Sequence, residues 1–365
     1  MKLFKCSNCG QAVYFENIYC QYCHSSLGFE THELSLYALK PENNRTYKLI
    51  SGSGNQNSYK YCQNHSYNVC NWLVQVGSYS PFCKACELNR TIPFLGQKDD
   101  YDKWYRVETA KRRLIHSLLR FGLEVKSKNT GWFGGIMFDF LSDRNTSDGQ
   151  RVLTGHDNGL ITINIAEADD IYREMSRNQM NEVYRTLLGH FRHEIGHYYW
   201  DILIGRTSKL HQFRDLFGDE RVDYGVALQQ YYSNNTSKIW KKQYISKYAS
   251  AHPWEDWAET WAHYMHIVDT LETADSFGLN VHPKVAADAM NTSFVDPYTV
   301  SNFDNIIDMW LPLTFAMNSL NRSMGLRDLY PFVISKTIKE KLRFIHEVVK
   351  EAGAFKAQGE QMLKS

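Results

Sequence analysis

The chain lacks an excess of charge of either sign, a long apolar run and any cysteine after residue 86. Its 365 residues carry 41 Lys+Arg against 40 Asp+Glu, which gives a formal net charge of +1. That balance argues against nucleic acid as a partner, because nucleic-acid binding favours a strongly basic surface. No run of 18 apolar residues occurs, so we expect no membrane span.

The first residues also lack the long apolar stretch of a secretory signal. We therefore expect a cytoplasmic protein. In a reducing compartment, cysteines bind metal ions or remain free thiols more often than they form disulfides.

All eight cysteines lie between Cys6 and Cys86, in two quartets. The first quartet is two CxxC pairs and the second ends on another: Cys6, Cys9, Cys20 and Cys23, then Cys62, Cys70, Cys83 and Cys86. Paired thiolates from tight turns make the tetrahedral sulfur site that zinc prefers, so we predict two structural zinc ions. Buried thiols remain the alternative for the less regular second quartet. The predicted parts are a zinc ribbon over 1–30, a second four-cysteine zinc module over 31–97, and one domain over 98–365.

Beyond residue 97 the pattern is mainly helical. Residues 102–123 have apolar side chains at helical spacing, and the basic run Lys111–Arg113 within them is expected on a solvated helix face. Two strands are predicted, one within Gly131–Leu141 and one over Leu160–Ile165, with a turn at Asp157–Gly159 before the second. From about residue 170 helices continue to the end. The predicted fold class is α+β, mainly α.

One motif carries chemistry. Residues 193–197 read His-Glu-Ile-Gly-His within a helical pattern from Met180 to Ile204. Positions i and i+4 of a helix share a face, so His193 and His197 can bind one zinc ion. Glu194 lies beside them, where its carboxylate can act as the base for a zinc-bound water.

A third metal ligand is still needed. A metzincin would place a glycine and a histidine where this chain has Trp200 and Leu203, which excludes that class. A later helical segment carries Glu255 and Glu259 at i and i+4. With Glu255 as the zinc ligand, Glu259 could accept a hydrogen bond from a zinc-bound imidazole and so orient it. Glu259 remains an alternative to Glu255 as the ligand.

The segment Glu255-Asp-Trp-Ala-Glu259 after the histidine motif resembles the gluzincin pattern, in which the first Glu binds zinc. It is similar to the catalytic domain of anthrax lethal factor, where a Tyr precedes that Glu by seven positions, as Tyr248 does here. The resemblance implies that Tyr248 stabilises the oxyanion or protonates the leaving amine. Glu220 follows His197 at a spacing close to that of other gluzincins, so it remains an alternative ligand.

The whole chain resembles a bacterial family of zinc-binding metallopeptidases with an N-terminal zinc ribbon. The resemblance includes Cys83–Arg90, Arg192–His197, Phe217–Tyr224 and His252–Glu259. It implies a zincin-like metallopeptidase domain over 98–365 and one catalytic zinc ion in addition to the two structural ones.

The predicted function is hydrolysis of peptide bonds in a peptide or protein substrate. The strand near Leu160–Ile165 is expected at a sheet edge, where an extended substrate can add as a further strand. A protein partner for the zinc modules is a further expectation. One alternative is a zinc-ribbon module that binds protein or nucleic acid and carries a non-proteolytic histidine motif. Another is amide hydrolysis on a non-peptide substrate.

Overall fold

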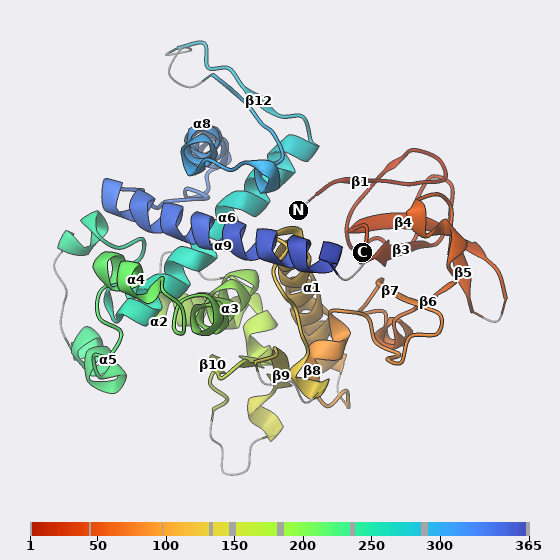
Figure 1. Ribbon diagram of the computed structural model, residues 1–365, viewed down its shortest axis with the longest axis horizontal. Coiled ribbons are helices and arrows are strands. Elements are labelled where there is room, and N and C mark those ends of the chain that lie inside the picture. The colour runs from red at the N-terminus through yellow and green to blue at the C-terminus, as the bar shows by residue number, and fades with distance from the viewer. Residues whose placement is uncertain are drawn as a thin grey trace. The chain divides into compact units, whose positions relative to one another are not determined.

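The structure is a computed structural model that describes residues 2–43, 45–96, 98–130, 134–145, 151–180, 186–233, 238–285 and 291–362. The chain forms two compact units (Figure 1). The first holds Met1–Arg120 and Val125–Arg173, and the second holds Phe121–Glu124 and Glu174–Ser365. The division into parts 1–30, 31–97 and 98–365 stays a prediction, because one compact unit can contain several such parts. None of the described helices is long and apolar enough to cross a membrane.

The first unit begins with β-structure that the sequence pattern did not predict. A short hairpin of β1 (Phe4–Lys5) and β2 (Ala12–Val13) precedes an antiparallel sheet in the order β3-β4-β5-β6-β7. These five strands are Leu27–Glu30, Ser35–Pro41, Tyr47–Leu49, Tyr59–Tyr61 and Leu73–Gln75. One face of this sheet buries a cluster of Tyr37, Leu39, Leu49, Tyr59 and Leu73. The strands hold together through this shared cluster, since most are too short to be stable alone.

Helix α1 (Lys98–Arg120) follows and confirms the helix predicted over 102–123. It ends where Gly122 adopts φ +70°, a left-handed conformation that glycine takes without strain. The expectation that Lys111–Arg113 forms a solvated face is wrong. Lys111 and Arg112 are buried, and only Arg113 is partly exposed, paired with Glu16.

A four-stranded sheet completes the first unit, in the order β10-β11-β9-β8. Its strands are β8 (Asn89–Thr91), β9 (Met137–Leu141), β10 (Gly155–Asp157) and β11 (Leu160–Asn164). The two predicted strands share one sheet, although residues 131–133 lie outside the described ones. Asn158 and Gly159 take positive φ in the two-residue turn between β10 and β11, as a primed hairpin turn requires.

The expectation that Leu160–Ile165 lies at a sheet edge is wrong. Strand β11 lies between β10, with which it pairs antiparallel, and β9, with which it pairs parallel. Both sides of its backbone are therefore occupied, and strand addition at β11 has no free partner.

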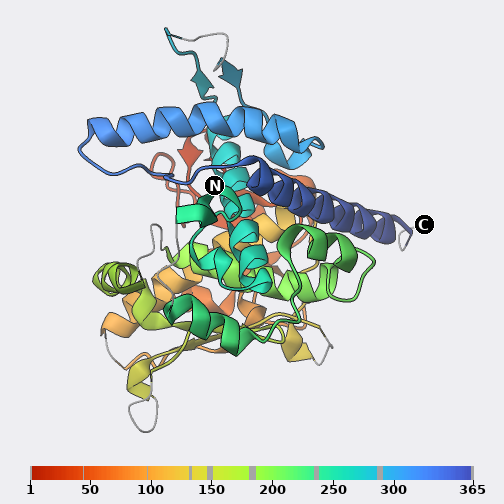
Figure 2. The ribbon, with the colours of Figure 1, turned by 90° about the vertical axis from the view of Figure 1, so that its left-hand side faces the viewer.

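The second unit is helical, as predicted, and α6 is its central helix. Its helices include α3 (Leu187–Leu203), α4 (Leu210–Phe217), α5 (Tyr224–Ser233), α6 (Pro253–Ser276), α8 (Phe303–Ser323) and α9 (Lys336–Met362). Figure 2 shows α6 running between its neighbours, and it packs against α3, α4, α8 and α9. The sequence predicts one helix over 180–204. Within this range the structure describes α3, while Met180 is the last residue of a separate helix, α2 (Asp170–Met180). Residues 181–185 lie outside the described residues.

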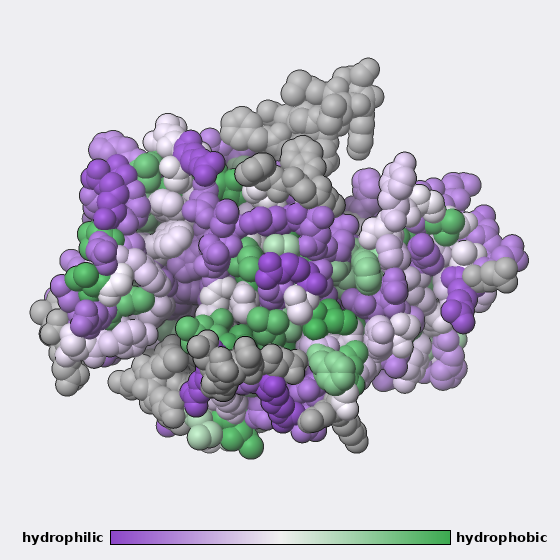
Figure 3. Space-filling model, turned by 90° about the horizontal axis from the view of Figure 1, so that it is seen from below, coloured by the Kyte–Doolittle hydropathy of each residue, from purple (hydrophilic) through white to green (hydrophobic). Residues whose placement is uncertain are grey.

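The surface carries some apolar side chains. Hydrophobic residues reach the face drawn in Figure 3 among hydrophilic ones. Helix α5, which is described over its whole length, contains no fully buried residue, and its Val226 and Tyr232 are exposed. Since burial of an apolar face supplies most of the stability of a helix in a protein, α5 gains little stability from burial.

Candidate metal centre

Both cysteine quartets bring their sulfur atoms together within the first unit. In the first quartet Cys6 Sγ lies 3.7 Å from Cys23 Sγ, and Cys9 Sγ lies 3.6 Å from Cys20 Sγ. These distances exceed the about 2.05 Å of a disulfide. They match the about 3.8 Å between sulfur ligands of a tetrahedral zinc ion with Zn–S bonds of about 2.3 Å. The first quartet therefore has the geometry of a zinc site.

The second quartet has the same geometry and lies beside a buried ion pair. Cys70 Sγ is 3.7 Å from Cys83 Sγ, and all four sulfur atoms lie within 4.8 Å of one another. Cys86 Sγ is 3.9 Å from Glu108 Oε2, which accepts from Lys111 Nζ at 2.9 Å. Four thiolates around one zinc ion would carry a net negative charge, and the ammonium of Lys111, itself paired with Glu108, is the buried positive charge beside them.

Helix α3 places two imidazoles on one face in the second unit. Its first turn is capped by Thr186, whose Oγ1 accepts from the backbone N–H of Gly189 at 3.0 Å. His193 and His197 are one turn apart, and their Nε2 atoms are 3.2 Å from each other. Both Nε2 atoms therefore face the same small region, where a single cation could be bound by both.

Helix α6 supplies a carboxylate to the same point. Glu255 Oε2 lies 3.0 Å from His193 Nε2 and 3.6 Å from His197 Nε2. Ligands of a tetrahedral zinc ion with bonds of about 2.0–2.1 Å are separated by about 3.3–3.4 Å, close to the three distances found here. Glu255 is buried, and its Oε2 is the carboxylate oxygen that faces both imidazoles. The donor set and its spacing fit a zinc ion.

Close packing of α3 on α6 makes this convergence possible. A Cβ atom on Gly196, between the two histidines, would lie 3.2 Å from Ala258 Cα and 3.2 Å from the Trp261 ring. Trp257 Nε1 also donates to the carbonyl of Gly196 at 2.9 Å. Two small residues at the crossing allow the helix backbones to approach, which brings Glu255 to the histidines.

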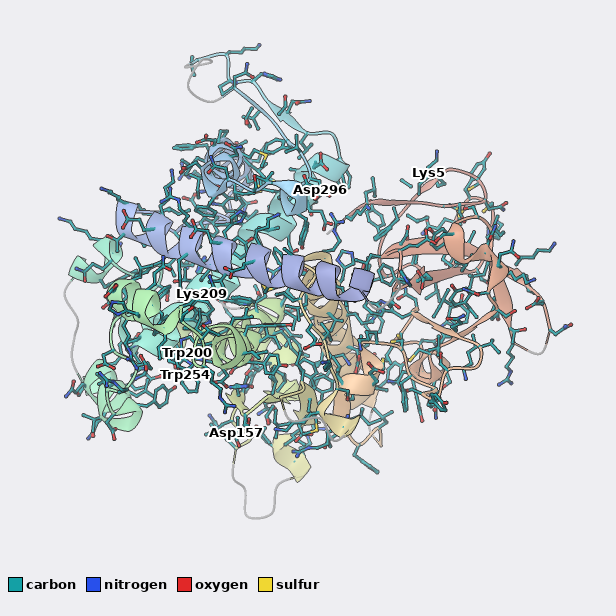
Figure 4. All side chains as sticks on the ribbon, viewed as in Figure 1. Lys5, Asp157, Trp200, Lys209, Trp254 and Asp296 are labelled. Carbon is teal, nitrogen blue, oxygen red and sulfur yellow. The ribbon has the colours of Figure 1, made fainter. Side chains whose placement is uncertain are left out.

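Aromatic rings surround this centre on the side of His197. The Trp254 ring meets the His197 ring edge to face at 4.9 Å between centroids. Trp200 and Trp254, which are labelled in Figure 4, lie side by side at 5.7 Å. Such rings exclude water and so strengthen the electrostatic interactions within the centre.

The other two candidate ligands have different positions. Glu259 Oε1 accepts from His193 Nδ1 at 2.7 Å, so it bonds the nitrogen that faces away from Glu255. Glu220 is paired with Arg214, whose Nε donates to its Oε2 at 2.9 Å. Among the described residues, the group that could hold one ion here is His193, His197 and Glu255.

Burial and charge shift the pKa values within the centre in opposite directions. Burial alone would lower the pKa of His193, but its hydrogen bonds to Glu255 and Glu259 raise it well above its ordinary value. Burial would raise the pKa of Glu255, but the charge of His197 and the hydrogen bond from His193 hold it well below. Burial raises the pKa of Glu194, which lies near enough to both histidines to sense their charges. Without metal the centre therefore favours a carboxylate and an imidazolium.

Two tyrosines adjoin the centre, and the sequence pointed to one of them. The Tyr248 ring centroid lies 6.0 Å from that of His193. Tyr224, at the first position of α5, donates its hydroxyl hydrogen to Glu255 Oε1 at 2.7 Å. Tyr224 was missed as a functional residue, although it ends the segment Phe217–Tyr224 on which the family resemblance partly rests. Burial raises the pKa of both hydroxyl groups, which keeps them protonated.

Two cysteine quartets ahead of a helical unit with a His-His-Glu centre define a zinc-binding protein with an N-terminal zinc ribbon. Comparison with known proteins agrees. The family described as "Putative zinc-binding metallo-peptidase" matches residues 100–348, and the family described as "zinc-ribbon domain" matches residues 3–97. The chain belongs to this zinc-binding metallopeptidase family.

Relatives from mycobacteria span nearly the whole chain. Uncharacterized proteins of Mycobacterium bovis and Mycobacterium tuberculosis are 41% identical to it over 352 residues, which cover 96% of this chain and 96% of each relative. No solved structure matches.

Proposed function

We propose that the chain is a zinc-dependent peptidase of the gluzincin type that hydrolyses peptide bonds. The observation that supports this most is the triangle of His193 Nε2, His197 Nε2 and Glu255 Oε2, with sides of 3.0, 3.2 and 3.6 Å. These three residues would hold the catalytic ion, and the two cysteine quartets would hold one structural zinc ion each.

The residues around the centre have separate roles in this proposal. Zinc, when bound, lowers the pKa of a coordinated water and polarises the scissile carbonyl. Glu194, next to His193 on α3, takes the proton of the attacking water and passes it to the leaving nitrogen. Glu259 holds His193 through Nδ1 and so keeps Nε2 directed at the centre. Tyr248 stabilises the oxyanion or protonates the leaving amine.

The proposed substrate is a peptide or a protein. The near-neutral charge of the chain favours such a substrate over nucleic acid. The cysteine quartets, which we assign to zinc, are compatible with a reducing compartment such as the cytoplasm. Protein partners for the zinc modules are part of the same proposal.

The test is digestion of a peptide library by the wild-type chain and by the Glu194→Gln variant. The variant keeps the size of the side chain but removes the base, so we expect its cleavage rate to fall by about 10²–10⁴-fold with zinc content unchanged. Mass spectrometry of the products measures cleavage, and elemental analysis measures zinc.

Two results would count against the proposal. Equal cleavage by both proteins would mean that a contaminant acts or that Glu194 has no catalytic role. Absence of cleavage by a wild-type chain with a full complement of zinc would favour a non-peptide amide as substrate, or a binding module without proteolytic activity.

A further inference from the structure

The two oxygens of the Glu255 carboxylate have different partners. Oε2 faces the Nε2 atoms of both histidines, at 3.0 and 3.6 Å. Oε1 accepts the hydroxyl hydrogen of Tyr224 at 2.7 Å. A carboxylate can bind a cation through one oxygen or through both, and a hydrogen bond that occupies one oxygen leaves the other as the ligand atom.

Tyr248 adjoins the same centre in a different way. Its ring centroid lies 6.0 Å from that of His193. Among the described contacts, the tyrosine hydroxyl that bonds the Glu255 carboxylate is that of Tyr224.

One histidine fixes the chain on both sides of this contact. His252 caps α6, because its Nδ1 accepts from the backbone N–H of Trp254 at 3.1 Å. Its Nε2 lies 3.1 Å from the carbonyl oxygen of Val222, two residues before Tyr224. Since Nδ1 accepts, Nε2 carries the proton and donates to Val222. A single ring thus connects the start of α6, which carries Glu255, with the segment that leads into α5.

The start of α5 is ordered by local contacts as well. Asp223 caps the helix, with Oδ1 accepting from the backbone N–H of Val226 at 2.8 Å. The Tyr224 ring meets the His252 ring edge to face at 5.2 Å. These contacts help to determine where the Tyr224 hydroxyl lies.

We propose that Tyr224 is a positioning residue of the metal centre that holds Glu255 through Oε1, so that Oε2 alone binds the ion. This role rests on the proposed function, because it requires Glu255 to be a ligand of the catalytic ion. It differs from the role proposed for Tyr248, which acts on the substrate.

The test compares the Tyr224→Phe and Tyr248→Phe variants in the full chain by zinc competition with a chromophoric chelator. Loss of an outer partner of a metal ligand costs about 10–100-fold in metal affinity, so we expect Tyr224→Phe to weaken the third zinc equivalent by that factor. Tyr248→Phe should leave this affinity unchanged, because its hydroxyl does not touch Glu255. The His193→Ala variant provides the baseline of the two cysteine sites. The helical circular dichroism of each variant reports whether the mainly helical second unit is folded.

A spectroscopic measurement separates positioning from a general loss of structure. The absorption of Co²⁺ in the third site, taken as the difference between each protein and its His193→Ala counterpart, reports the coordination of the ion. We expect Tyr224→Phe to change this spectrum and Tyr248→Phe to preserve it.

Wild-type affinity together with a wild-type spectrum in Tyr224→Phe would overturn the role of Tyr224 and leave the proposed peptidase intact. A wild-type chain that binds no third metal would overturn both proposals.

Discussion

Two histidines on α6 are kept neutral by their surroundings. His263 and His266 lie on α6 beyond the metal centre. His263 Nδ1 is 2.9 Å from the Tyr330 hydroxyl, and His266 Nδ1 is 3.3 Å from Arg192. Burial lowers the pKa of His263 to about 4, and burial with the charge of Arg192 lowers the pKa of His266 to about 3. Both rings are therefore neutral at pH 7 and serve packing and hydrogen bonding.

This arrangement predicts that acid destabilises the fold. The folded-state pKa of each ring lies below its unfolded value of about 6.5, so the unfolded chain binds more protons between these values. Stability should be complete above pH 6.5 and should fall as the pH drops toward 4, by at most about 1.4 kcal/mol per pH unit for each ring. Denaturant unfolding at several pH values, in a His193→Ala background that lacks one ligand of the proposed metal centre, measures the slope.

Two substitutions test this prediction, one at a buried histidine and one at an exposed histidine as the control. His263→Gln should reduce the slope, whereas His211→Gln, at an exposed position on α4, should leave it unchanged. A slope that is equal in all three proteins would show that other groups cause the acid sensitivity.

At the scale of elements, the metal centre depends on how closely two helices cross. The crossing of α3 and α6 is at Gly196 and Ala258, and an added Cβ on Gly196 would be 3.2 Å from the Ala258 backbone. Ala258 belongs to a helix and Trp261 is fully buried, so neither can move far.

Gly196→Ala should therefore push the helices apart. Overpacking costs about 1–3 kcal/mol, and the higher helix propensity of alanine offsets about 1 kcal/mol of that. We expect a net loss of stability and weaker binding of the third zinc ion, measured by denaturant unfolding and chelator competition.

Gly225→Ala on α5 is the control, because a Cβ there meets only Asp223 Oδ1, at 3.5 Å. This substitution should be neutral or stabilising. If Gly196→Ala behaved in the same way, the close approach of the helices would not be required.

The elements also show what the sequence could predict. The histidine motif, the helix of Glu255 and the three CxxC pairs are local, since each needs only a turn or a helical repeat to place its side chains. The parallel pairing of β11 with β9 is less local, because it joins strands about twenty residues apart, and the short strand β10 was not predicted, so β11 was wrongly placed at an edge. Tyr224 escaped notice for the same reason: its partner Glu255 is 31 residues away, on another helix.

For the whole molecule, we expect three zinc ions, each of which stabilises a different part. The cysteine quartets belong to the first unit, where short strands and turns surround them, and the His-His-Glu centre belongs to the second. A structural zinc site contributes directly to folding, whereas a catalytic site is built on helices that already pack.

Elemental analysis of purified protein should thus give three zinc ions per chain, and two in both His193→Ala and Cys83→Ser. Only Cys83→Ser, which removes a buried thiolate, should increase hydrogen exchange across the first unit. Three ions in His193→Ala would contradict the site on α3, and three in Cys83→Ser would contradict the second cysteine site.

The crossing of α3 and α6 has one more consequence. His197 and Glu255 are separated by 57 intervening residues, and an ion bound between them acts as a reversible cross-link that closes this long loop. A ligand that binds only the folded state adds about 1.4 kcal/mol of stability for each tenfold excess over its dissociation constant. The second unit would therefore become more resistant to unfolding and proteolysis as free zinc rises, so the supply of metal would govern how long the protein persists as well as whether it is active.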